Sequence, residues 1–200
     1  VRKVDLDSNS VIEMIQLKQI TFLTPSDGTG TASIIAGSSS QGQQDGTGTE
    51  ASFHNPYGVA IDPSGTYALV TDRSNHRICK IVLATGEVTT LAGIGSQGYW
   101  DDTGTAASFR NPIGIAIHPS STYALVADTL NHRIRKIMID TKVVTTLVGN
   151  GAGTQDGTGI SAYFNQPYGI AIDPSGTFAL VADSDNNRIR KIMIDTKVVT

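Results

Sequence analysis

Short apolar runs of strand length recur along most of the chain in groups of four. In the middle of the chain they occupy 113–117, 123–127, 133–139 and 143–148, and each contains several Ile, Val, Leu or Ala residues. Runs of this length bounded by Gly, Pro, Asn and Asp are typical of β-strands. None of them shows helical periodicity for more than two turns, so the pattern predicts an all-β chain.

The turns between the runs have a chemistry of their own. Pro-Ser-Gly-Thr or Pro-Ser-Ser-Thr separates the first run from the second, where Pro fixes φ and Gly tolerates a positive φ. Asp-x-x-Asn followed by His or Asn separates the second from the third, where Asn tolerates the left-handed region. Such tight turns predict that consecutive strands pair as antiparallel neighbours.

The group of four runs is an internal repeat. Residues 111–149 resemble both 55–93 and 166–200, and the segment 133–145 returns unchanged at 188–200. Four antiparallel strands per unit, joined by a long crossover, are typical of the blade of a β-propeller. We expect one blade at each of 38–93, 94–149 and 150–200, the last truncated in its fourth strand. Residues 1–37 are expected to form a partial first blade with an irregular insertion, either an extra hairpin or a protruding loop.

A propeller ring needs four to eight blades, whereas this sequence supplies strands for about 3.5. We therefore expect an incomplete ring. It is either an arc of a longer polypeptide or part of an assembly in which further copies or segments complete the propeller.

Three motifs recur in register in the repeat units: P-x-G-[IV]-A-I-[DH]-P-S, A-L-V-[AT]-D and N-[HN]-R-I-x-K-I. With them the chain resembles the NHL repeat family of β-propellers, in its long variety with a TLAG strand and a DGTG crossover. The resemblance implies a propeller fold. It also implies three kinds of function found in such propellers: protein interaction, metal-dependent amidating-lyase activity and RNA binding. Because the long variety is common in extracellular and multidomain proteins, the resemblance favours an extracellular or cell-surface location.

Composition narrows these functions. The formal net charge of −3 gives no broad positive surface for neutralising phosphates, which disfavours nucleic acid. No apolar run approaches the ~20 residues of a membrane helix, so no membrane segment is expected in this stretch. Cys79 is the single cysteine, which excludes an internal disulfide, leaves open its pairing with another chain, and predicts a buried, inert strand residue.

One polar set repeats in every unit and looks at first like a reactive constellation. An active site in a ring is normally singular, so a set present in every blade is expected to hold the fold, with Asp accepting from turn amides or from Arg. The third strands also carry basic residues, Arg135, Lys136, Arg190 and Lys191, which we expect at a solvated strand edge with their charges in water. The repeated set comprises Asp72, Asn75, Arg77, Asp128, Asn131, Arg133, Asp183, Asn186 and Arg188.

Metal binding has only weak candidates. Asp45, Asp101 and Asp156 lie in the DGTG-like crossovers, but each loop offers one or two carboxylates where calcium needs several oxygen ligands. His118 stands where the other units carry Asp and is the one histidine near an inner strand. We expect no metal, no cofactor and no catalytic residues, since no Ser/His/Asp or paired-carboxylate arrangement can be assigned.

The crossover loops are the candidate surface for a partner. The most unusual local feature is the pair Tyr99 and Trp100, which is either a contact patch or a loop anchor packed on its own blade. Copies as similar as these suit scaffolding better than a single pocket, so the leading hypothesis is a non-enzymatic module that binds a protein or builds an assembly. The alternatives are an amidating-lyase type of enzyme and an RNA-binding propeller. The candidate contact residues are Tyr99, Trp100, Asp101, Asp102, Gln155 and Asp156.

Overall fold

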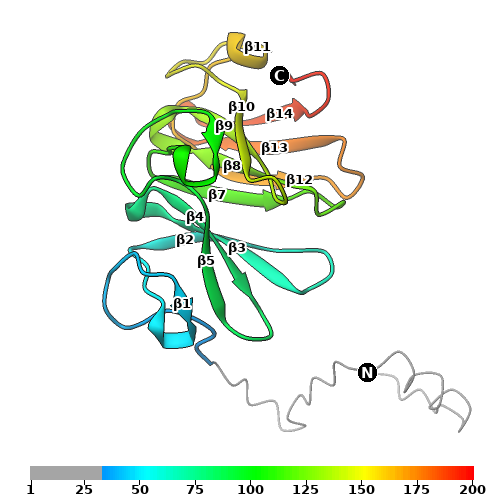
Figure 1. Cartoon of the computed structure of the whole chain (residues 1–200). Helices are drawn as coiled ribbons and strands as arrows, with labels where there is room; N and C mark the ends of the chain where they lie inside the picture. The colour runs from blue at the N-terminus through cyan, green and yellow to red at the C-terminus, as the bar shows by residue number, and fades with distance from the viewer. Residues whose placement is uncertain (1–32) are drawn as a thin grey trace, which may run out of the picture. The chain divides into compact units, whose positions relative to one another are not determined.

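The structure is a computed structural model that describes residues 33–200, and most of the partial blade predicted at 1–37 lies outside this range. The described residues form three antiparallel sheets that follow one another along the chain (Figure 1). The all-β prediction is confirmed. No helix within 33–200 has the length and apolar character that crossing a membrane would require.

Each sheet is one blade. Blade 1 contains β1 (Gly46–Thr47), β2 (Pro56–Ile61), β3 (Tyr67–Asp72), β4 (Arg77–Val82) and β5 (Glu87–Ala92). Blade 2 contains β6 (Asp102–Thr103), β7 (Pro112–Ile117), β8 (Tyr123–Asp128), β9 (Arg133–Met138) and β10 (Val143–Val148). Blade 3 contains β11 (Gly157–Thr158), β12 (Pro167–Ile172), β13 (Phe178–Asp183), β14 (Arg188–Met193) and β15 (Val198–Val199). Six single-turn 3₁₀ helices complete the pattern: Gly48–Glu50, Arg73–Asn75, Gly104–Ala106, Thr129–Asn131, Gly159–Ser161 and Ser184–Asn186.

Each blade has a fifth strand where the sequence predicts four. Two residues of the crossover pair with the fourth strand, and in blade 1 Gly46 lies opposite Val88 in the order β1-β5-β4-β3-β2. Gly48 follows with a φ of 58°, and its amide donates to the carbonyl of Gly86. Because an alternating pattern cannot be recognised in two residues, the sequence reads this segment only as a turn.

The apolar core lies between blades. We call the face of a blade that packs on the preceding blade its leading face, and the face that receives the following blade its trailing face. Leu125 and Ile134 on the trailing face of blade 2 pack against Val181 and Ile192 on the leading face of blade 3. The contact between blades 1 and 2 repeats this arrangement with the residues Leu69, Ile78, Ile115, Val126 and Ile137.

The innermost strands β2, β7 and β12 converge, which gives the sheets their radial arrangement. A Cβ atom on Gly58 would lie 2.2 Å from the carbonyl oxygen of Ile113, and one on Gly114 would lie 2.1 Å from that of Tyr168. Only glycine permits so close an approach of two strands. Thr71 of blade 1 adds a hydrogen bond of 2.8 Å to the same Ile113 carbonyl.

Candidate functional site

A buried arginine joins three segments of blade 2. The Arg135 guanidinium donates to Asp128 at 2.8 Å, to Asp101 at 2.6 Å, and to the carbonyls of Ser108 and Trp100 at 3.0 and 2.9 Å. The Arg135 and Asp128 side chains are fully buried. Arg135 therefore ties strand β9 to strand β8 and to the crossover loop on either side of β6, and we call this arrangement the arginine latch.

Blade 3 has the same latch and blade 1 has a variant of it. Arg190 pairs with Asp183 at 3.1 Å and with Asp156. In blade 1 the corresponding strand position holds Cys79, and the guanidinium comes instead from Arg77, two residues earlier. Arg77 donates to Asp72 at 2.8 Å and to Asp45 at 3.0 Å, the equivalents of the latch carboxylates in the other blades. Burial raises the pKa of the Cys79 thiol to about 12, which keeps the thiol protonated beside Arg77.

The structure differs here from two expectations. Arg133 and Arg188 do not pair with the buried Asp of their blades; Arg133 lies half-buried with its guanidinium 5.3 Å from the centre of the Tyr99 ring, and Arg188 is exposed. Arg135 and Arg190, expected at a solvated edge, are buried because the crossover carbonyls and two carboxylates accept their hydrogen bonds. One feature of the sequence indicates which arginine is buried: Cys79 stands in blade 1 at the repeat position that holds Arg135 in blade 2 and Arg190 in blade 3.

The buried aspartates also fix the start of the innermost strand of their own blade. Asp72 accepts 2.7 Å and 2.8 Å hydrogen bonds from the amide of His54 and the side chain of Asn75, and the Asn75 amide also donates to the carbonyl of Gly42. Asn131 and Asn186 make the same pair of contacts in their blades. Burial raises the pKa of Asp128, and its ion pair with Arg135 opposes the rise. The repeated set thus connects strand, turn and crossover in every blade.

The crossover carboxylates are occupied by the protein itself. Both oxygens of Asp45 accept hydrogen bonds from Thr90, and one of them also pairs with Arg77. Asp101 makes the same contacts with Thr146 and Arg135. Within residues 33–200, no three His, Cys, Asp or Glu side chains are grouped closely enough to hold a metal ion.

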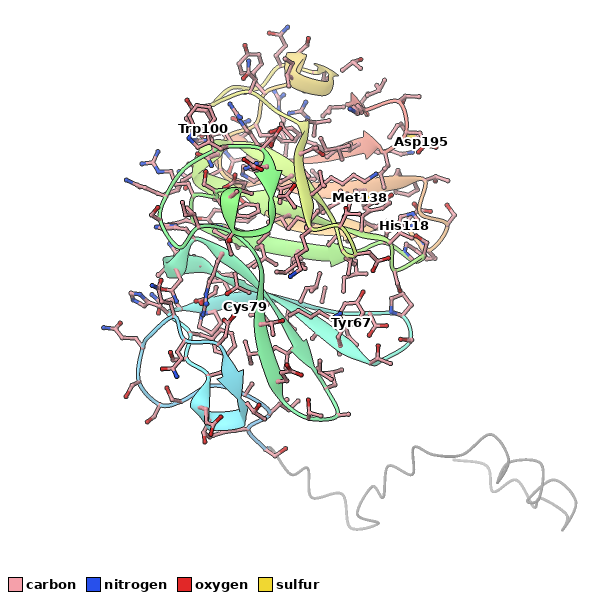
Figure 2. The ribbon with its side chains drawn as sticks, viewed as in Figure 1. Tyr67, Cys79, Trp100, His118, Met138 and Asp195 are labelled. Atoms are coloured by element: carbon pink, nitrogen blue, oxygen red, sulfur yellow. The ribbon has the colours of Figure 1, made fainter. Side chains whose placement is uncertain are left out.

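His118 lies in the turn between β7 and β8, on the opposite side of Figure 2 from Trp100. Its Nδ1 atom is 2.7 Å from the hydroxyl of Ser120, its Nε2 atom is 3.2 Å from the carbonyl oxygen of Gly176, and its ring stacks on Tyr123. In blade 1 Asp62 takes this place. Burial raises the pKa of Asp62, but hydrogen bonds from the Ser64 hydroxyl and from backbone amides outweigh that effect and lower it to about 2.

His76 and His132 connect neighbouring blades. Each ends a 3₁₀ turn in the left-handed conformation, with φ of 53° and 54°. The Nδ1 atom of His76 accepts a 3.1 Å hydrogen bond from the amide of Asn111, and that of His132 accepts one from the amide of Gln166. Both contacts need a neutral imidazole, and burial lowers the pKa of both histidines, with Arg110 adding to the effect.

The crossover of blade 2 presents the aromatic pair to solvent. Trp100 is 65% exposed and stacks on Tyr99, with 4.9 Å between ring centroids, and Figure 2 shows it at the edge of the described residues. The backbone of Trp100 is fixed at both its polar groups. Its amide donates a 2.9 Å hydrogen bond to the Ser108 hydroxyl, and its carbonyl accepts one from Arg135. Trp100 is therefore not a loop anchor buried in its own blade.

The other candidate contact residues differ from this pair. Asp101 and Asp156 are bound to the latch arginines, so their carboxylates are only partly free to meet a partner. Asp102 is exposed and accepts a hydrogen bond from the amide of Thr103. Gln155 occupies the place of Trp100 in blade 3, and its carbonyl accepts the same two kinds of hydrogen bond, from Tyr163 and Arg190.

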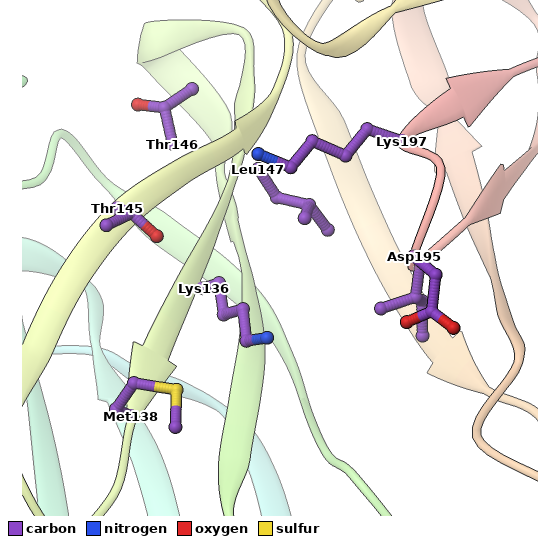
Figure 3. Close-up of a pocket in the computed structure, with 8 residues that line it drawn as sticks. Lys136, Met138, Thr145, Thr146, Leu147, Asp195 and Lys197 are labelled. Carbon is purple, nitrogen blue, oxygen red and sulfur yellow. The ribbon is translucent and has the colours of Figure 1, made fainter.

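Two grooves accompany these features. One, of about 410 Å³, runs along the innermost strands and is lined by Tyr57, Val59, Ile115, Tyr168 and neighbouring residues. The other, of about 300 Å³, lies between blades 2 and 3 (Figure 3), where Lys136, Asp195 and Lys197 bring charge to a wall of Met138, Leu147 and Ile194.

The three sheets repeat along the chain, converge on their innermost strands and carry the same buried polar set. These features define a β-propeller built from tandem blades. No protein-family model matches the chain. NHL repeat-containing protein 2 of Bos taurus is 29% identical over 162 residues, which cover 76% of this chain and 22% of that protein. With these relatives and its repeat motifs, the chain belongs to the NHL repeat family of β-propellers.

Two further similarities extend the comparison. Peptidyl-glycine alpha-amidating monooxygenase of Mus musculus is 30% identical over 147 residues, 72% of this chain and 14% of that protein. The crystal structure of an auxiliary nutrient binding protein from Bacteroides ovatus superposes with a TM-score of 0.63 at 25% identity, over 72% of this chain and 38% of that one. The chain thus spans less than a quarter of the length of the curated relatives it matches.

Proposed function

We propose that this chain is a non-enzymatic propeller module that binds a protein partner through the crossover loop of blade 2. The aromatic pair is the centre of the proposed surface, with Arg133 beside it. Tyr, Trp and Arg are the residues that most often dominate the energy of protein interfaces. An exposed Trp whose backbone is already fixed also loses little conformational entropy on binding.

One observation carries the proposal: the fold builds the same loop without the aromatic pair. In blade 1 the places of Tyr99 and Trp100 are taken by Gln43 and Gln44. The Gln44 carbonyl accepts the amide of Ser52 at 2.9 Å, as the Trp100 carbonyl accepts that of Ser108 at 3.1 Å. The amide of Gln44 likewise donates to the Ser52 hydroxyl at 3.0 Å. Since glutamines at these positions form the same backbone hydrogen bonds, the loop does not need the aromatic rings in order to fold.

The test replaces the aromatic pair with the residues of blade 1, in the double variant Tyr99→Gln, Trp100→Gln. We expect its free energy of unfolding to fall by no more than about 1 kcal/mol, the value of the exposed cation–π contact between Arg133 and Tyr99 that the variant removes. Partners captured by the wild type from extracellular or cell extracts are expected to be lost by the variant. The matched control is Gln43→Ala, Gln44→Ala, which alters the same loop positions in blade 1 and should keep the partner.

Trp100 also supplies a direct readout, because it is the only tryptophan in the chain. Titration with a purified partner should shift its fluorescence to shorter wavelength as the indole leaves water. A partner that binds the double variant as tightly as the wild type, or a fluorescence spectrum unchanged at saturation, would refute this surface.

Similarity to an amidating monooxygenase makes an enzyme of that type the second candidate. The described residues do not fit the metal site that such an activity would need. His118 is engaged by Ser120 and Gly176, and the crossover carboxylates are bound to arginine and threonine. Elemental analysis of the purified chain tests this candidate: stoichiometric zinc or calcium would support it, and its absence would remove it.

A further inference from the structure

The trailing face of blade 3 is a copy of a face that is buried elsewhere in the molecule. Ile134 and Leu125 on the trailing face of blade 2 are fully covered by blade 3. Their equivalents on blade 3, Ile189 and Leu180, are 69% and 43% exposed. The segment containing Ile189 repeats the sequence around Ile134 without change. Within residues 33–200, this surface is therefore uncovered, although its copy on blade 2 is covered by a blade.

The leading face of blade 1 is open along its innermost strand, whereas Val70 and Ile81 on the same blade are buried in a cluster with Ala36 and Phe53. Val59 is 65% exposed and Ile61 is also exposed, whereas Ile115, the equivalent of Val59 in blade 2, is buried against blade 1. Ile170, the equivalent in blade 3, packs against blade 2. Val59 and Ile61 thus belong to a face that, in the two other blades, fits onto a trailing face.

Space at the innermost strands leads to the same conclusion. Gly58 and Gly114 each lie against a carbonyl of the next inner strand. Around the corresponding Gly169 of blade 3, an added Cβ would meet only the Cβ of Ala182, at 3.7 Å. The position that a further inner strand takes beside the first two glycines is vacant beside the third.

We propose that a second copy of this chain docks on these faces, with the leading face of blade 1 in each copy seated on the trailing face of blade 3 in the other. The contact continues the interface already present between blades 1 and 2 and between blades 2 and 3. The three blades described in residues 33–200 do not close a ring by themselves, since a propeller closes with four to eight. Head-to-tail contacts of this kind close into a ring when the rotation matches.

The chemistry of the two faces favours this partner over an unrelated one. Both halves of the contact occur on the same chain, and each has an equivalent that is buried between two blades of the molecule. The trailing face of blade 2 also includes Leu147 and Val148 of β10, for which β15 offers no counterpart. We therefore expect association that depends on concentration, with a dissociation constant on the order of micromolar.

Sedimentation velocity over a range up to about 100 µM, well above that dissociation constant, tests the proposal on the full 200-residue chain. The wild type should sediment as a dimer at the upper end of this range. Val59→Lys and Ile189→Lys should each give monomers, because each charge falls in one half of the contact. Ile160→Lys is the matched control, since Ile160 is equally exposed but lies in the crossover of blade 3, away from both faces.

Mixing distinguishes this contact from nonspecific association. A Val59→Lys chain retains a good trailing face and an Ile189→Lys chain retains a good leading face, so an equimolar mixture should recover a dimer held by one interface. A wild type that stays monomeric at the highest concentration would overturn the proposal and assign the faces to another occupant. Dimers that survive either substitution, or that are lost equally with Ile160→Lys, would also overturn it.

Discussion

A single exchange in one column of the repeat shows how this fold uses arginine. Where blades 2 and 3 have Arg135 and Arg190, blade 1 has Cys79, and the guanidinium arrives from Arg77 on the same side of the strand. The two carboxylate acceptors are equivalent in all three blades, so the position of the buried charge is kept while the residue that supplies it changes. An uncompensated buried carboxylate is costly, which explains why no blade lacks the guanidinium.

The repetition of Asp, Asn and Arg could be recognised from sequence, but which arginine turns inward could not. Residues two apart on a strand share a face, so Arg133 and Arg135 are both able to reach Asp128 by local geometry. The choice depends on crossover acceptors about thirty residues away in sequence, such as the carbonyls of Trp100 and Ser108. Local pattern carries no information on such partners.

A double-mutant cycle in blade 2 tests whether Arg133 can replace Arg135 as the partner of Asp128. Arg135→Cys recreates the arrangement of blade 1, and we expect Arg133 to turn inward as Arg77 does, for a loss of about 1 kcal/mol in unfolding free energy. The Nε atom of Arg135 has no hydrogen-bond partner, whereas that of Arg77 donates to Asp72, so the substitute loses no contact there. Arg133→Ala alone should cost about 0.5–1 kcal/mol, the value of an exposed cation–π contact.

The double variant, Arg133→Ala with Arg135→Cys, leaves Asp128 without a counter-charge and should cost about 3–5 kcal/mol. Urea denaturation of the four proteins gives the coupling energy. Losses that simply add, or an Arg135→Cys chain as unstable as the double variant, would contradict the exchange.

At the scale of elements, the strands and their tight turns follow from the sequence, whereas the outer strand and the links between blades do not. The two-residue strands β1, β6 and β11 exist because a glycine turns the crossover back onto the fourth strand. The sequence pattern identifies His76 and His132, which end two of the 3₁₀ turns, only as turn residues. Their hydrogen bonds to the next blade depend on packing that the sequence pattern does not encode.

These histidine links predict a dependence of stability on pH. The pKa of His76 and of His132 is lower in the folded chain than the ordinary value of about 6.5, so the unfolded chain binds more protons in the window just below that value. Their contribution should be complete above pH ~6.5 and fall as the pH drops toward the folded pKa values. At His132 the carboxylates of Asp185 and Asp183 oppose the lowering, so His76 should contribute more.

The variant His76→Asn, His132→Asn checks this origin, because blade 3 carries Asn187 in the same left-handed position. Urea denaturation at a series of pH values between about 7 and 5 should show a slope for the wild type that is reduced in the variant. Equal slopes in the two proteins would show that other groups cause the dependence.

At the scale of the whole molecule, burial is set by neighbouring blades and not by a residue's own sequence. Ile134 and Ile189 lie in identical segments, yet one is buried and the other is among the most exposed apolar residues described. The repeat predicts the blades and the incompleteness of the ring. The repeat does not identify which blade faces are exposed to solvent, because the copies have nearly the same sequence.

Hydrogen exchange measured by NMR at the two identical segments tests this account most directly. Their intrinsic exchange rates are equal, so any difference reports on packing, and the Val59→Lys chain keeps both segments intact while removing the proposed association. Amides that β9 donates to β8 should exchange more slowly than those that β14 donates to β13, because blade 3 covers the first set and none of the three described blades covers the second. Equal protection in the two segments would contradict the radial packing of blades on which the account depends.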